Sequence, residues 1–117
     1  MVNESTNVFR TPTANDPVLT EVVRRLVKAY RPERVYLFGS VARGDAGPDS
    51  DYDLLVVVPD DALPEHRRSR LAYEVLRGTG AAADVLVCTR SYFEQRRQLK
   101  ASLPGTVLRE GRALHVA

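Results

Sequence analysis

Residues 35–58 read VYLFGSVARGDAGPDSDYDLLVVV, and this stretch decides the fold. Residues 35–38 form a compact β-prone run that ends at Gly39, and residues 52–58 form a second run. The second run is almost continuously apolar, which is typical of a strand covered on both faces in a central sheet. Residues 40–50, between the runs, have the composition of a turn and loop. The stretch therefore predicts two strands joined by a polar loop.

Helical and strand patterns alternate around this stretch. Asp16 is placed as a capping residue, and Pro17 opens an amphipathic helix that should stop at Tyr30 or Arg31, because Pro32 cannot continue it. Further segments are expected as helices over 64–77, 92–99 and 106–110, a third strand over 83–89 and a short closing segment over 113–116. This alternation predicts an α/β fold, with a small mixed β-sheet and helices packed against it.

The composition bounds the protein class. The 117 residues fit one domain, expected over 16–117, while residues 1–15 are polar and aperiodic and predict a flexible leader. The net charge of +2 suits a phosphate-bearing ligand, and a nucleic-acid partner is compatible with it but not favoured. No apolar run approaches the ~20 residues of a membrane span, and no hydrophobic signal core opens the chain, so we expect a cytoplasmic protein. Cys88 lies in an apolar run and is expected to be a small buried hydrophobe.

The loop after the first strand carries the chemistry. Gly39 allows a sharp turn and a close approach to a ligand, and Ser40 supplies a hydroxyl near free amides, a combination that holds phosphate oxygens. Asp51 and Asp53 are two residues apart at the start of a strand, so their side chains share one side of the sheet with Cα atoms about 6.6 Å apart. Two carboxylates this close repel one another, and Mg²⁺ bound with a triphosphate would compensate them.

A third carboxylate and an arginine complete the predicted site. Asp84 opens the third strand much as Asp53 opens the second, so the two acids meet if these strands are neighbours. Asp51, Asp53 and Asp84 would then hold two metal ions about 3.5–4 Å apart, for in-line attack on an α-phosphate with loss of pyrophosphate. Arg43, from the same loop, would neutralise charge that develops on the phosphates.

Plainer interpretations exist for many of these residues. Turn formation and solvation account for Asp45 and Asp49, so neither is placed in the site. Asp51 and Asp53 could be a solvated loop end, and Asp84 could simply end the burial of its strand. A basic patch for a nucleotide or an acidic partner is possible, but such charges usually solvate helix faces; its candidates are Arg67, Arg68, Arg70, Arg96, Arg97 and Lys100.

The pattern Gly39-Ser40, ten residues, then Asp51-x-Asp53 resembles the signature of the minimal nucleotidyltransferases of the DNA polymerase β superfamily. The similarity extends over roughly residues 17–115. It implies a polymerase-β-like nucleotidyltransferase fold, in which Gly39 and Ser40 form the nucleotide-binding corner and Asp51 and Asp53 bind the metal ions. Asp84 matches the third acid of the family.

The resemblance also implies a biological role. Minimal members of this superfamily commonly act as antitoxins paired with a helical HEPN-domain toxin, and some transfer AMP onto a tyrosine of that partner. We therefore expect Mg²⁺-dependent transfer of a nucleoside monophosphate, with ATP as the leading donor, to a protein hydroxyl. One alternative is a non-catalytic antitoxin that neutralises its partner by covering it. Another is an enzyme that adds nucleotides to RNA ends, for which eight aromatic residues offer few stacking surfaces.

Overall fold

The computed structural model describes residues 16–44 and 51–117. The predicted leader, residues 1–15, and the loop residues 45–50, with Asp45 and Asp49, lie outside the described residues. Four strands form one sheet in the order β3-β2-β1-β4, with bounds Arg34–Phe38 for β1, Tyr52–Val58 for β2, Ala83–Thr89 for β3 and Arg112–Val116 for β4. Strands β2 and β3 are parallel, whereas β1 is antiparallel to both β2 and β4. The predicted mixed sheet is thereby confirmed.

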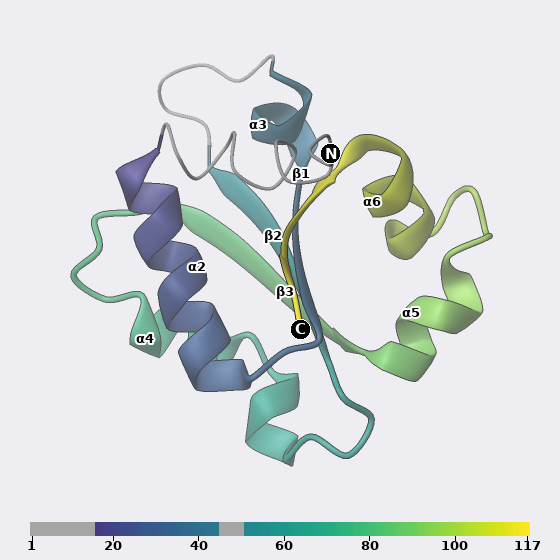
Figure 1. Ribbon diagram of the computed structural model, residues 1–117, viewed down its shortest axis with the longest axis horizontal. Helices are drawn as coiled ribbons and strands as arrows, with labels where there is room; N and C mark the ends of the chain where they lie inside the picture. The colour runs from purple at the N-terminus through teal and green to yellow at the C-terminus, as the bar shows by residue number, and fades with distance from the viewer. Residues whose placement is uncertain (1–15, 45–50) are drawn as a thin grey trace, which may run out of the picture.

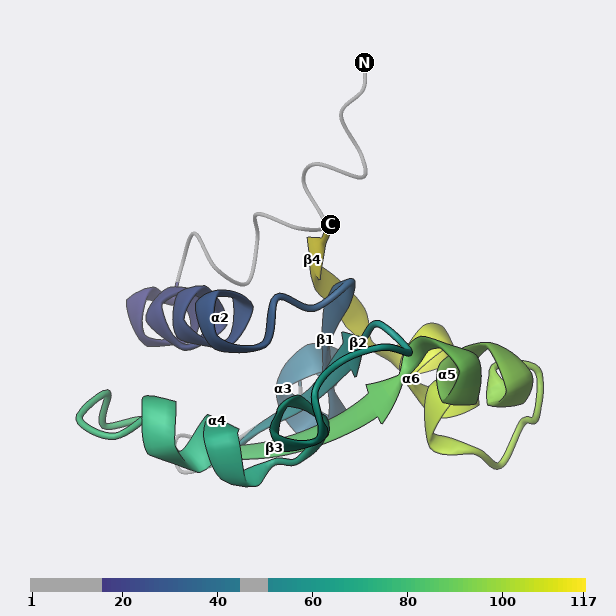
Figure 2. The same cartoon turned by 90° about the horizontal axis from the view of Figure 1, so that it is seen from below.

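Helices cover both faces of this sheet. Figures 1 and 2 show α2 (Pro17–Tyr30) and α4 (Arg70–Val75) on one side of the strands, and α5 (Arg90–Arg96) and α6 (Leu103–Glu110) on the other. Each side has its own apolar cluster, one containing Leu26 and Val56 and the other Leu55 and Phe93. Strand β2 is central, and its residues Leu54 to Val58 are all buried, as its unbroken apolar run predicts.

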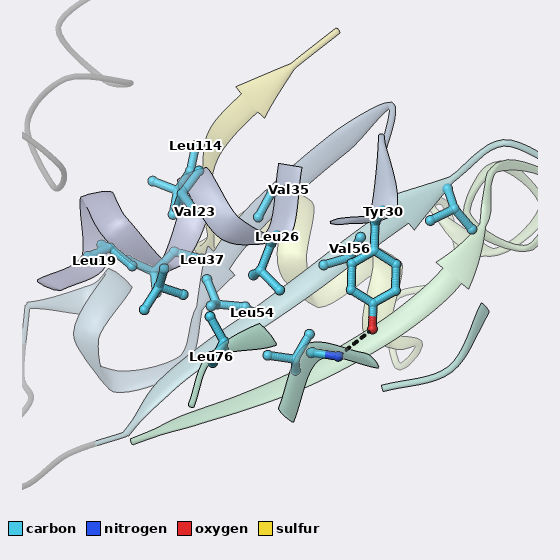
Figure 3. Close-up of a cluster of buried hydrophobic side chains, with 14 of the residues drawn as sticks. Leu19, Val23, Leu26, Tyr30, Val35, Leu37, Leu54, Val56, Leu76 and Leu114 are labelled. Carbon is cyan, nitrogen blue, oxygen red and sulfur yellow. Dashed lines mark hydrogen bonds between the residues drawn. The ribbon is translucent and has the colours of Figure 1, made fainter. Parts of the chain in front are cut away.

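Helix α2 has the predicted boundaries. The Asp16 carboxylate accepts a hydrogen bond from the backbone N–H of Leu19 at 3.0 Å, and Pro17 occupies the first helical turn. Arg31 adopts a left-handed conformation with φ 49°, and Pro32 follows it. The buried face of the helix, seen in Figure 3, packs on the sheet through Leu19, Val22, Val23, Leu26 and Tyr30.

The continuous helix predicted over 64–77 is wrong. The structure has a 3₁₀ turn η1 (Pro64–Arg67), an extended residue at Arg68, and then the short helix α4. The hydroxyl of Tyr30, from α2, donates to the carbonyl of Arg68 at 2.5 Å. It also accepts from the backbone N–H of Ala72 at 2.9 Å, the bond drawn as a dashed line in Figure 3. A buried side chain of another element therefore claims backbone groups that a continuous helix would use internally.

Smaller differences concern loops and helix ends. Residues 40–43, part of the predicted turn and loop, form with Gly39 the short helix α3 (Gly39–Arg43), closed by Gly44 with φ 82°. Helix α5 begins at Arg90, before the predicted 92, because Thr89 caps it, and it ends at Arg96. Helix α6 begins at Leu103, before the predicted 106, because the Ser102 hydroxyl accepts from Gly105 N–H at 3.1 Å. In residues 16–44 and 51–117, no helix is both long and apolar enough to cross a membrane.

Candidate active site

Two of the predicted acids are direct cross-strand partners. In the parallel pair of β2 and β3, Asp53 is opposite Asp84, each being the second residue of its strand. Alternation along β2 places Tyr52 against the α2 and α4 cluster and Leu55 against the α5 and α6 cluster. Asp53 therefore lies on the sheet face of Leu55. Asp84 lies beside it on the same face.

The Asp53 carboxylate occupies the space that a side chain at position 39 would need. In the antiparallel pair of β1 and β2, Phe38 is opposite Asp53, and the chain turns into α3 at Gly39 with φ 75°. A Cβ added at Gly39 would lie 2.2 Å from Oδ2 of Asp53. No side chain fits here while the carboxylate keeps its place. The glycine that the sequence suggested for a close approach to a ligand thus also makes room for a carboxylate of the site.

The charge distribution shows a cluster of acids that lacks full compensation. Burial, followed by the neighbouring carboxylates of Asp84 and Asp51, raises the pKa of Asp53 above its ordinary value of 3.8, and the Arg43 guanidinium opposes this shift. Asp51 and Asp84 are exposed at the same end of the sheet. Arg43 is exposed as well, and it forms an ion pair with Glu110 at 3.6 Å. A cation would relieve the repulsion among these carboxylates.

The donor chemistry fits Mg²⁺. Carboxylate oxygens on a strand are hard ligands, and the pKa of Asp53 is raised first by burial and then by the neighbouring carboxylates. Among residues 16–44 and 51–117, no three acidic, histidine or cysteine side chains already form a metal-binding cluster. Asp53 and Asp84 are brought together by the strand register, and Asp51 directly precedes β2. Ser40, in the first turn of α3, follows the Gly39 corner.

Two tyrosines that the sequence analysis did not include in the site make hydrogen bonds that support it. The hydroxyl of Tyr52 donates to the carboxylate of Asp16, so the residue between the two acids is tied to the cap of α2. Burial and this contact raise the pKa of Tyr52 to about 12. The hydroxyl of Tyr73, from α4, donates to Oδ1 of Asp84 at 3.4 Å. Neither contact has a signal in the sequence, because each partner comes from a distant segment.

Comparisons with known proteins agree with this architecture. Similar solved structures include a toxin–antitoxin complex with AMP-PNP (22% identity, 83% of this chain and 73% of that chain, TM-score 0.56). A putative nucleotidyltransferase from Sulfolobus solfataricus is similar too (24% identity, 80% and 82% coverage, TM-score 0.52). A mutant of the toxin–antitoxin MntA-HpeT also aligns (19% identity, 84% and 73% coverage, TM-score 0.55). At these identities the three structures show a shared fold.

The sequence comparisons identify the family to which the chain belongs. No curated protein matches the chain. A family model described as the nucleotidyltransferase domain matches residues 19–114, which include the Gly39 corner and the three acids. That span covers most of the chain and confirms the resemblance drawn from the Gly-Ser and Asp-x-Asp pattern. The chain belongs to the nucleotidyltransferase domain family.

Proposed function

We propose that the chain is a Mg²⁺-dependent transferase that moves AMP from ATP to a protein hydroxyl, as the antitoxin of a HEPN-domain toxin. Family membership supports the class of reaction. Two neighbours in fold are toxin–antitoxin complexes, and one of them is described with the ATP analogue AMP-PNP. The other is a mutant in which two aspartates, two positions apart, are changed to glutamate, the same spacing as Asp51 and Asp53 here.

The observation that carries the proposal is the placement of Asp53. On one side, the missing side chain of Gly39 leaves room for the Asp53 carboxylate. On the other side, the pairing of β2 with β3 places Asp84 directly opposite Asp53. An aspartate that served only to solvate a loop end would need neither the room left by Gly39 nor a second acid opposite it. Asp51, Asp53 and Asp84 would hold the magnesium ions, which supply charge neutralisation of the triphosphate and activation of the acceptor hydroxyl.

The remaining roles follow from the chemistry of this chain's residues. The acceptor oxygen bonds to the α-phosphorus while the bond to the α,β-bridging oxygen breaks, and pyrophosphate leaves. The hydroxyl proton passes to the carboxylate of Asp84, which Tyr73 orients through its hydrogen bond. Gly39 and Ser40 line the corner for the phosphates, and Arg43 neutralises charge on them. Its charge already acts on Asp53, where it opposes the rise in pKa caused by burial and the other carboxylates.

Intact-protein mass spectrometry tests the reaction. The product of the reading frame adjacent to the one that encodes this chain, called the neighbouring protein below, is incubated with the chain, ATP and Mg²⁺. Its mass is expected to rise by one or more AMP units. The double variant Asp51→Asn, Asp53→Asn should abolish the gain. Asp61→Asn, which changes an exposed aspartate outside the site, is the matched control and should retain it. Omission of Mg²⁺ should also abolish the gain.

Other outcomes would redirect the proposal. A double variant that still neutralises the neighbouring protein, with no adduct formed by either chain, would indicate the alternative of a covering antitoxin. An adduct on RNA ends in place of protein would indicate the RNA-directed alternative. Loss of the adduct in Asp61→Asn as well would show that the assay reports folding or expression, and not the carboxylates of the site.

A further inference from the structure

A groove of about 770 Å³ opens beside β3, on the part of the molecule that the proposed mechanism does not use. Its apolar lining comes from the strands and helices, through Leu55, Leu86, Cys88, Tyr92 and Leu103. Its other wall is the segment 67–70, which runs from the last residue of η1 to the first residue of α4, where the predicted helix is broken. The break at Arg68 therefore places residues 67–70 so that they form one wall of the groove.

The groove and the acids lie on one face of the sheet. Asp84, Leu86 and Cys88 alternate along β3 with Val85 and Val87, which pack toward α2 and α4. At the usual rise of a strand, Leu86 is about 7 Å from Asp84 and Cys88 about 13 Å. A chain that lies along β3 in this groove therefore leads toward the carboxylates.

Strand β3 offers an open edge to such a chain. It is the terminal strand of the sheet, and in the described part of the chain it pairs only with β2. Leu86 is 44% exposed, whereas its neighbour Leu55, on the same face of β2, is 1% exposed. An edge strand with a free hydrogen-bonding side and an uncovered leucine is the surface to which an extended peptide adds.

The charges around the groove select an acidic chain. Arg67, Arg68 and Arg70 line it and are exposed, and no acidic residue is among its described lining residues. Arg96 adds a further charge 4.0 Å above the ring of Tyr92. The aliphatic floor suits a peptide better than RNA, because the lining aromatic, Tyr92, already has a guanidinium on its face.

We propose that this groove docks an extended acidic segment of the acceptor protein. The segment adds to the free edge of β3, places apolar side chains on Leu86, and meets Arg67, Arg68 and Arg70 with its carboxylates. The inference rests on the proposed function, since it assigns the docked chain to the protein that receives AMP.

Fluorescence anisotropy with defined probes tests the groove. The probe is a labelled peptide of about ten residues, alternating Glu and Val, which matches the length of a strand. A Lys and Val peptide and an oligouridine of the same length are the competing probes. Leu86→Glu and Arg68→Glu should each weaken binding of the acidic peptide by about tenfold or more, a loss of the size seen for central interface residues.

Matched variants guard against general effects. Val116→Glu changes an exposed residue of the opposite edge strand, β4, and Lys28→Glu reverses an exposed charge on α2, across the sheet. Both should bind the acidic peptide as the unchanged chain does. In addition, amide exchange in residues 85–89 should slow when the peptide binds, as strand addition requires. Equal binding of the basic peptide, tighter binding of oligouridine, no binding of the acidic peptide or an equal loss in the controls would each overturn the proposal.

The outcome is separable from that of the proposed function. The Asp51→Asn, Asp53→Asn variant should retain peptide binding although it loses transfer. Peptide binding without any AMP adduct would leave the groove standing and the reaction refuted. An AMP adduct formed on the neighbouring protein at an unchanged rate by Leu86→Glu would leave the reaction standing and the groove refuted.

Discussion

Replacing Gly39 by alanine should disable the site while leaving the fold intact. The new Cβ would lie 2.2 Å from Oδ2 of Asp53, whereas real Cβ atoms essentially never approach a heavy atom closer than 3.0 Å. Asp53 is the second residue of β2 and is held in register between Phe38 and Asp84, so its backbone cannot follow freely. The carboxylate must therefore rotate away by about 1 Å or more.

The size of the effect follows from two separate costs. Alanine at φ 75° loses about 1–2 kcal/mol of folding free energy, because a Cβ is disfavoured in the left-handed region. In a domain of this size, each 1 kcal/mol lowers Tm by about 4–8 °C. Displacement of a reacting group by about 1 Å lowers the rate by about a hundredfold, and this second cost is independent of stability.

Gly78 provides the matched control. It has φ 84°, and a Cβ added there would meet nothing within 4 Å, so Gly78→Ala carries the same backbone strain without the collision. Both variants are assayed by thermal unfolding and by the rate of AMP transfer to the neighbouring protein. We expect similar losses of Tm and a loss of transfer, about a hundredfold, only in Gly39→Ala. Equal transfer rates in the two variants would refute the idea that the Gly39 corner positions Asp53.

Two further predictions concern stability. Tyr30→Phe removes a buried hydroxyl that bonds the carbonyl of Arg68 and the N–H of Ala72. The free energy of unfolding, measured by urea titration, should therefore fall by about 1–3 kcal/mol. A change under about 0.5 kcal/mol would contradict the bridging role of the hydroxyl. The side chain and backbone N–H of Ser91 bond the carboxylate of Asp60 and hold its pKa below the ordinary value of 3.8. The carboxylate therefore stabilises the fold above that value and loses its effect as the pH falls through the lowered pKa, so Asp60→Ala should lower Tm at neutral pH and converge with the unchanged chain in strong acid. A difference in Tm that is the same at both pH values would contradict it.

The sequence predicts well the strands that carry Asp53 and Asp84, because local patterns determine those strands. The apolar runs 52–58 and 83–89 are bounded by polar residues and become β2 and β3 with the predicted limits. Two such apolar runs are expected side by side in a small sheet, and the observed register sets Asp53 opposite Asp84. The helix before them is bounded by a capping aspartate and by Pro32, which act on their own neighbours.

Other features depend on contacts between distant segments, and the sequence does not show them. The helical pattern over 64–77 is real, but Tyr30 interrupts it from another helix. The contact of Gly39 with Asp53 requires the antiparallel register of β1 and β2, and the hydrogen bond from Tyr73 to Asp84 requires the placement of α4. Arg67, Arg68 and Arg70 were expected mainly to solvate a helix face, and the break in that helix places them along a groove instead.

The strand order has a consequence for how the chain folds. The pair β1 and β2, over 34–38 and 52–58, has the smallest sequence separation of the strand pairs in this sheet, so it should form before β1 pairs with β4. The outer edge of β1, by contrast, is paired with 112–116 and stays bare until those residues have been synthesised. During that interval the chain presents two open strand edges, one on β1 and one on β3. Chains stalled before residue 112 should therefore be prone to aggregation through β1, even though most of the acidic site is already assembled.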